Sequence, residues 1–328
     1  KRQPCNEGAR FIMEDLDKAI SLMQDGFDKN HTRISPDAAR LFKSRVALYE
    51  GSWLTYFAGT AFVPNGEGWP GKAKEYNANY QYPTGSVDAE AKYFLQESAK
   101  AAEMVADKYK DQLMVNTGTI PQKEGDPQNP YFNIWGTTDM SGTPEVILWR
   151  QYSKELGVVN NVEVGVQHGD FGVGLTRSMV EGYVMKDGKP IYNSAYTYSD
   201  QTIADVATNR DPRLTIFLKV PGQKNVFKNM SAPEDHYVID EPYPTITTRN
   251  AENDYSTGYA IRKGGTFDKA NTGNGNCYNA AEIFRATEAL LNYMEAEYML
   301  TNSLSGKVLE YWKDVRKAAG FTGDAVNP

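Results

Sequence analysis

The chain has 328 residues, of which 40% are hydrophobic and 23% charged, as is typical of a globular protein with one large or two ordinary domains. Its net charge of −7 argues against the basic surface that nucleic acids or anionic lipid headgroups require. No apolar run reaches the about 18 residues of a membrane span, and the first residues show no signal peptide. Two cysteines, Cys5 and Cys277, are too few for a disulfide scaffold or a zinc site. One bridge between them stays open beside the simpler expectation of two free buried thiols.

Helical spacing predicts two helices at the start of the chain. The first runs from about Glu7 to Met23, and its expected core side is Phe11, Ile12, Leu16, Ile20 and Met23. The second begins at Ser35-Pro36, an N-cap residue followed by proline at the first helical position. Its expected core stripe is Ala39, Phe42, Val46, Tyr49, Trp53 and Tyr56.

A third helix is predicted to begin near Asp88, which is expected to be its cap. Its repeating stripe is Ala91, Leu95, Ser98, Ala102, Val105 and Tyr109. Three of these residues are small, which predicts that another helix approaches closely.

The region 111–275 is rich in Gly, Pro, Asn, Asp and Thr, and few periodic runs survive in it. Glu145–Tyr152 is the clearest strand candidate, and Asp187-Gly188 suits a hairpin turn between short strands. A loop-rich stretch of this length either builds a binding site or is disordered. The chain's 21 Tyr, 13 Phe and 5 Trp disfavour disorder.

Two further helices are predicted at 279–300 and 306–319, with Gly320 as the C-terminal stop. The first of them carries one polar stripe, formed by Arg285, Glu288, Asn292 and Glu295 at steps of three and four. Nearly all its other residues are apolar, so we expect this helix to be enclosed by other helices and the stripe to form a packed polar network.

Several segments, taken in chain order, resemble the SusD/RagB family of Bacteroidetes surface lipoproteins. They are KSRVALYEG at 43–51, TPEVIL at 143–148, GYVM and DGKP at 182–190, NRDPRL at 209–214, TGY and RK at 257–263, the helix at 283–297, and VRKAAG at 315–320. The resemblance implies a mainly α, SusD-like fold of tetratricopeptide-type helix pairs with a few short strands. It implies a single domain over 1–328, with helical pairs at 1–110, a ligand-side region at 111–275 and a C-terminal pair at 276–328. It also implies a longer lipoprotein, with a lipid-bearing segment before this chain and an arginine-rich helical segment after it.

No catalytic motif stands out. The three histidines, His31, His168 and His236, are scattered, and neither a zinc spacing nor a Gly-x-Ser-x-Gly elbow occurs. The Gly-rich segment 169–174 is interpreted as a turn, because the dinucleotide fingerprint is incomplete. Arg210, Asp211 and Arg213 are predicted to be structural, with the arginines pairing with carboxylates to hold two segments together.

Aromatic residues on loops are the better binding candidates, because a flat ring stacks on the C–H face of a pyranose. The candidates are Trp69, Tyr131, Trp135, Tyr196 and Tyr243. Tyr49, Trp53 and Tyr56 are instead assigned to the core, because they follow helical spacing.

The resemblance implies a non-catalytic glycan-binding protein of the outer-membrane surface, anchored by a lipid. Its partners would be an oligosaccharide and a SusC-like TonB-dependent transporter, with no cofactor; a structural calcium ion is left open. Three alternatives remain: a RagB-like binder of peptides, a glycoside hydrolase, and a helical scaffold without a small-molecule site.

Overall fold

The computed structural model describes residues 3–26, 28–121, 125–169, 174–223, 240–244, 246, 255–266, 271 and 273–328. The chain divides into two compact units. The first comprises Lys1–Leu113, Pro144–Leu148 and Phe284–Asp314, and the second comprises Met114–Thr143, Trp149–Ile283 and Val315–Pro328. A single domain with internal boundaries at 110 and 275 stays a prediction.

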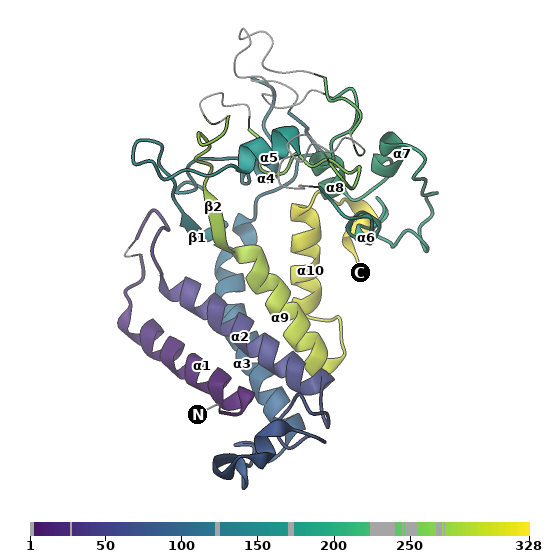
Figure 1. The fold of residues 1–328 in the computed structure, drawn as a ribbon. Helices are drawn as coiled ribbons and strands as arrows, with labels where there is room; N and C mark the ends of the chain where they lie inside the picture. The colour runs from purple at the N-terminus through teal and green to yellow at the C-terminus, as the bar shows by residue number, and fades with distance from the viewer. Residues whose placement is uncertain are drawn as a thin grey trace. The chain divides into compact units, whose positions relative to one another are not determined.

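The first unit is built from long helices, which confirms the mainly α fold with helix pairs. They are α1 (Cys5–Leu22), α2 (Pro36–Tyr56), α3 (Val87–Tyr109), α9 (Ala286–Thr301) and most of α10 (Lys307–Ala318), with the short 3-10 turns η1 (Pro70–Ala73), η2 (Glu75–Asn77) and η3 (Lys110–Gln112). Figure 1 shows α1, α2, α3 and α9 side by side, with α3 against both α2 and α9. The side chains of Ser35 and Ser86 cap α2 and α3, as serine oxygens do when they accept from the free N–H groups of a first turn. The cap predicted at Asp88 is wrong, because Asp88 lies within the first turn of α3.

The close approach of α3 to its neighbours confirms the stripe predicted on that helix. A Cβ on Gly51 of α2 would lie only 2.9 Å from Leu95 of α3. The hydroxyl of Ser98 donates to the carbonyl of Ser44 at 2.9 Å, and the amide of Asn292 on α9 donates to the Ser44 hydroxyl at the same distance. Small residues let these three helices meet at backbone distance, and their polar groups satisfy one another.

The expected core sides of α1 and α2 are wrong for their large aromatic residues, although Ala39 of the predicted stripe is buried. Phe11 is 64% exposed, Tyr49 63% and Tyr56 72%. The buried residues include Asn6, Ala9 and Met13 on α1 and Ala38, Ala39, Leu41, Ser44, Ala47, Leu48, Gly51 and Leu54 on α2. Since α2 packs against α1, α3 and α9, small and aliphatic residues fill its inner faces, and Trp53 packs half-buried against Phe57.

The helix predicted at 279–300 begins later than expected. Residues Ala281–Arg285 form strand β2, which pairs with β1 (Val146–Arg150) in a two-stranded sheet, so the strand predicted at 145–152 is confirmed. The N–H of Ala286 donates to the carbonyl of Glu145, where the strand passes into α9. Pairing with β1 supplies backbone partners that override the helical pattern of this stretch.

The predicted polar stripe of α9 therefore makes separate contacts. Arg285, at the end of β2, lies 3.2 Å from the buried carboxylate of Glu145. Glu288 forms a two-point ion pair with Arg45, both contacts at 2.6 Å. Asn292 is buried, and Glu295 is exposed. Full enclosure of the helix is also wrong, because the outward face of α9 keeps exposed apolar residues, namely Leu291 and Tyr298.

The second unit consists of short helices joined by turns. They are α4 (Pro130–Asn133), α5 (Val162–His168), α6 (Arg177–Gly182), α7 (Ile203–Ala207), α8 (Pro212–Phe217) and the 3-10 turn η7 (Gly323–Val326). The turn predicted at Asp187-Gly188 is present, since the N–H of Met185 donates to the carbonyl of Lys189 at 2.8 Å. Strand pairs do not flank it in the described residues, where Met185 makes an isolated bridge to Arg210.

Both cysteines are free thiols. Cys277 is buried and Cys5 is exposed, so neither the bridge nor the pair of buried thiols is correct. In the described part of the chain, no helix combines the length and hydropathy of a membrane span.

Candidate functional site

The turn at 209–213 holds three segments of the second unit together. Arg210 is 2% exposed and donates to the backbone carbonyls of Val180 at 2.5 Å, Tyr183 at 2.9 Å and Val206 at 3.4 Å. These partners are carbonyls, whereas the sequence predicted carboxylates. Burial lowers the pKa of this guanidinium. A planar group with five donors matches several carbonyls at once, so Arg210 fixes the ends of α6 and α7.

Asp211 and Arg213 form the next part of this turn. Asp211 caps α8 by accepting from the N–H of Arg213 at 2.9 Å, while Pro212 occupies the first helical position. The carboxylate also accepts from the Arg213 side chain at 3.0 and 2.6 Å. Although burial opposes it, this ion pair raises the pKa of Arg213. The turn therefore acts as a brace for α8.

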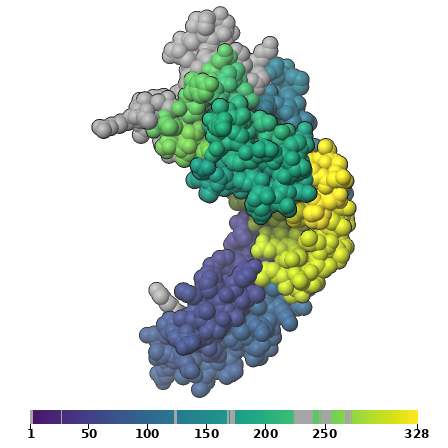
Figure 2. Space-filling view, turned by 90° about the vertical axis from the view of Figure 1, so that its right-hand side faces the viewer, coloured from purple at the N-terminus to yellow at the C-terminus, as the bar shows by residue number. Residues whose placement is uncertain are grey.

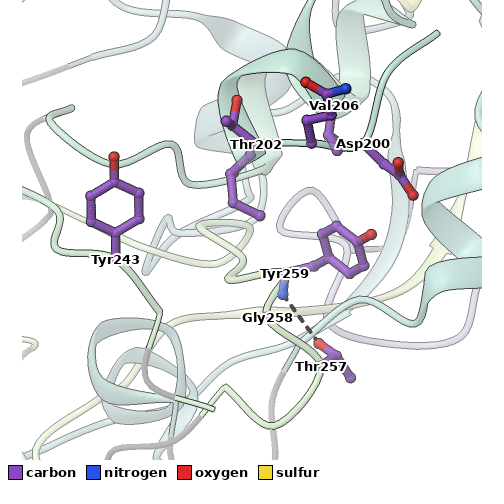
Figure 3. Close-up of a pocket in the computed structure, with 9 residues that line it drawn as sticks. Asp200, Thr202, Val206, Tyr243, Thr257, Gly258 and Tyr259 are labelled. Atoms are coloured by element: carbon purple, nitrogen blue, oxygen red, sulfur yellow. Dashed lines mark hydrogen bonds between the residues drawn. The ribbon is translucent and has the colours of Figure 1, made fainter.

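A pocket of about 310 Å³ lies beside this brace, within the second unit. It is lined by Asp200, Gln201, Thr202, Ile203, Val206, Tyr243, Thr257, Gly258 and Tyr259. In Figure 2 the teal segment that includes α6 to α8 adjoins the light-green segment near residue 260 on one face. Figure 3 shows the tyrosines of the pocket entering from separate segments, with the Asp200 carboxylate on the side of the Tyr259 hydroxyl.

Short-range hydrogen bonds fix the backbone of two segments that line the pocket. Thr202 and Asp205 form a capping box at the start of α7, with the two side chains 2.8 Å apart and each accepting from the other's backbone N–H. Gly258 adopts φ +76° in a turn whose N–H donates to the carbonyl of Tyr255, and the Tyr259 N–H donates to the Thr257 hydroxyl at 3.3 Å (Figure 3). The backbone must adopt a left-handed conformation at this position, which favours glycine.

The two tyrosines differ in burial. Tyr259 packs against the apolar cluster of Val180, Val206, Leu214 and Leu218, and its carbonyl accepts from the N–H of Leu175 at 3.0 Å. Tyr243 is 78% exposed. One ring is thus fixed as part of the floor, and the other is free to meet a ligand from the solvent side.

Asp200 brings charge to the rim. Its Oδ2 accepts from Nη2 of Arg177 at 2.7 Å, and Arg177 also donates through Nε to Glu181 at 2.7 Å. The hydrogen bond to Glu181 and the two carboxylate charges raise the pKa of Arg177. The pocket thus combines two phenol rings, a carboxylate, an amide and hydroxyls, a set suited to binding a polyhydroxylated ligand.

Of the five aromatic candidates from the sequence, Tyr243 alone lines this pocket. Tyr131 and Trp135 come together, but in an apolar cluster around Phe217, with ring centroids 6.1 and 6.4 Å from that ring. The ammonium of Lys263 lies 3.5 Å from the Trp135 ring centroid and covers one of its faces.

The other two candidates lie elsewhere. Trp69 belongs to the first unit, where its half-buried ring tilts against Tyr80 at 5.9 Å. Tyr196 is 38% exposed and follows Ser194, whose hydroxyl binds Asp187. The structure therefore gathers no shared platform from the five residues.

In the described part of the chain, no group of three His, Cys, Asp or Glu side chains is placed to hold a metal ion. His236 and most of the predicted turn at 169–174 lie outside the described residues.

The sequence model of the SusD family matches residues 144–327, more than half of the chain. The chain belongs to the SusD family. Its fold is similar to that of a SusD-like protein from Bacteroides fragilis, with a TM-score of 0.57 and 21% identity over 96% of this chain and 52% of that one. The protein BT4246 matches with a TM-score of 0.63 and 15% identity over 97% of this chain and 61% of that one. A structure solved with a xylogluco-oligosaccharide matches with a TM-score of 0.54 and 14% identity over 96% and 49%.

This SusD-family chain thus spans about half to three-fifths of the length of the solved structures that it matches. At these identities the matches show a shared SusD-like fold. No curated protein sequence matches the chain.

Sequence reasoning missed most of the pocket of this SusD-family protein. Asp200, Gln201 and Thr202 precede a helix of five residues, too short for a periodic signal. The Thr202–Asp205 capping box is a usable local signal, and Thr257-Gly258-Tyr259 contributes to the sequence prediction only through the family resemblance. Nothing local indicates that these segments meet Tyr243.

Proposed function

We propose that this protein is a non-catalytic glycan-binding component of the outer-membrane surface, which captures oligosaccharides for a SusC-like TonB-dependent transporter. Membership of the SusD family supports the proposal, and so does a protein of similar fold that was solved with a xylogluco-oligosaccharide. The observation that carries it is the pocket, where tyrosine rings and unengaged polar groups face the same space.

The chemistry of the pocket suits sugars. A phenol ring offers an apolar face to the C–H groups of a pyranose, and Tyr243 presents most of its surface to solvent. The described residues engage neither the amide of Gln201 nor the hydroxyl of Tyr259 in a hydrogen bond, so both are available to sugar hydroxyls. A shallow site of this size gives weak affinity for a single sugar and favours several linked units.

A RagB-like peptide binder is the second candidate within the family. An extended peptide would be bound through hydrogen bonds of its own backbone groups to the protein. The rings of Tyr243 and Tyr259 would then contact apolar side chains of the peptide. Membrane attachment through a lipid and partnership with the transporter belong to the proposal in either case, and no cofactor is required for binding.

The test is binding of the purified protein to a panel of oligosaccharides by calorimetry, with Tyr243→Ala and Tyr192→Ala beside it. Tyr192 is 87% exposed, belongs to the same unit and does not line the pocket, so it is a matched control. Loss of one stacking ring is expected to weaken binding about tenfold in Tyr243→Ala. Tyr192→Ala should bind like the parent protein. Equal binding by all three proteins, or binding of peptides and of no glycan, would overturn the proposal.

A further inference from the structure

The charged groups at the pocket are predominantly acidic. Asp200 lines it directly, Asp205 on α7 bonds the lining residue Thr202, and Glu181 lies on α6. Arg177 is shared between Glu181 and Asp200. Arg210 is committed to backbone carbonyls below the pocket floor. Among the described residues, no cationic side chain lines the pocket itself.

Only one of the two carboxylate oxygens of Asp200 has a hydrogen-bond partner among the described residues. Arg177 approaches only Oδ2, at 2.7 Å, and the described residues provide Oδ1 with no hydrogen-bond donor. The Asp200 side chain is 41% exposed. A carboxylate oxygen with free lone pairs accepts strongly from sugar hydroxyls, and such charge-assisted bonds are about twice as strong as neutral ones. The same oxygen repels a second carboxylate or a sulfate.

We infer that Asp200 makes this pocket selective for uncharged glycans over uronic-acid or sulfated ones. The inference rests on the proposed function and names its ligand class. Arg177 holds the carboxylate through Oδ2, and Figure 3 shows this carboxylate on the same side as the Tyr259 hydroxyl. A ligand anion placed here would lie near the carboxylates of Asp200, Asp205 and Glu181. The nearby Arg177 already pairs with Asp200 and Glu181.

The probes are gluco-oligosaccharides of β-1,4, α-1,4 and β-1,3 linkage, each paired with its C6-oxidised form. Oxidation at C6 changes a hydroxymethyl group to a carboxylate and leaves linkage and length unchanged. The parent protein is expected to bind the neutral member about tenfold more tightly, because like charges a few ångströms apart repel by that order at a protein surface. Added salt should shrink the preference through screening.

The decisive variant is Asp200→Asn, which keeps the shape of the side chain and removes its charge. Its preference for the neutral member should fall from about tenfold to below about threefold. Glu155→Gln is the matched control, because it changes the net charge by the same amount. Glu155 is exposed and bonds only to Ser153 on its own loop. It should keep the full preference.

The two levels of failure are distinct. Equal binding of neutral and oxidised probes by the parent, tighter binding of the oxidised probes, or an unchanged preference in Asp200→Asn would overturn the selectivity while glycan binding stands. A parent protein that binds neither these probes nor any member of the oligosaccharide panel would overturn the proposed function, and the selectivity with it.

Discussion

The buried carboxylate of Glu90 allows a sharp test of how α1 is held to α3. Oε1 of Glu90 accepts from Asn6 Nδ2 at 2.9 Å and from Arg10 Nε at 2.7 Å, and Oε2 accepts from Arg10 Nη2 at 3.0 Å and Thr84 Oγ1 at 2.7 Å. In Glu90→Gln one of these positions becomes an NH₂ group, so at least one N–H group of Arg10 faces another donor whichever way the amide lies. Removing one partner of a buried ion pair costs about 3–5 kcal/mol of unfolding free energy. Because the Arg10 side chain is 22% exposed and can be hydrated, we expect about 3 kcal/mol.

The assay is thermal unfolding followed by far-UV circular dichroism, which reports chiefly on the long helices. A loss of this size corresponds to a fall in Tm of about 6–12 °C for a unit of this length. Glu103→Gln on the same helix is the matched control, because Glu103 forms an exposed ion pair with Lys307. The Glu103 side chain is 40% exposed and that of Lys307 39%. An exposed pair contributes below about 1 kcal/mol. Equal shifts for the two variants would refute the reasoning.

Further predictions concern acid stability and the core. Burial raises the pKa values of Asp37 and Glu90, but hydrogen bonds from their partners outweigh it and hold both below their ordinary range. Their contribution to stability is therefore present above about pH 4 and is lost as the pH falls through the folded-state pKa values. A urea-midpoint series against pH should fall less steeply at the acid end for Glu90→Gln than for the parent. Phe94→Ala, in a fully buried ring position, should lower the unfolding free energy by about 3–5 kcal/mol in urea titrations. Tyr56→Ala should change it by less than about 0.5 kcal/mol, because that ring is exposed; similar losses for both would favour the core stripe expected from the sequence.

Local signals in the sequence predicted the long helices well. Ser35-Pro36 starts α2 because a capping oxygen and a fixed proline φ act within a few residues. The small residues of α3, such as Ser98 and Ala102, correctly indicated close helix packing. The segments quoted for the family resemblance also identified the SusD family, which the match over residues 144–327 shows.

The same signals failed where packing against other elements decides which residues are buried or which secondary structure forms. Periodicity placed Tyr49 and Tyr56 in the core, because it finds a stripe without saying which of two adjoining faces is covered. The helix predicted from residue 279 begins at Ala286, since β1 offers β2 backbone partners that no local pattern reveals. Both errors come from packing partners that are distant in the sequence.

By itself the sequence determined the long helices of the first 110 residues, the Ser35 cap of α2 and the family, because each depends on short-range geometry or on an ordered set of short motifs. Only the tertiary structure decided which faces are buried and where a ligand can bind. The pocket joins Asp200 at the start of α7, Tyr243 on a connecting segment and Tyr259 after a glycine turn. These residues meet because Tyr259 packs on the apolar cluster below α7 and hydrogen-bonds Leu175, and long-range contacts of this kind leave no periodic trace in the chain.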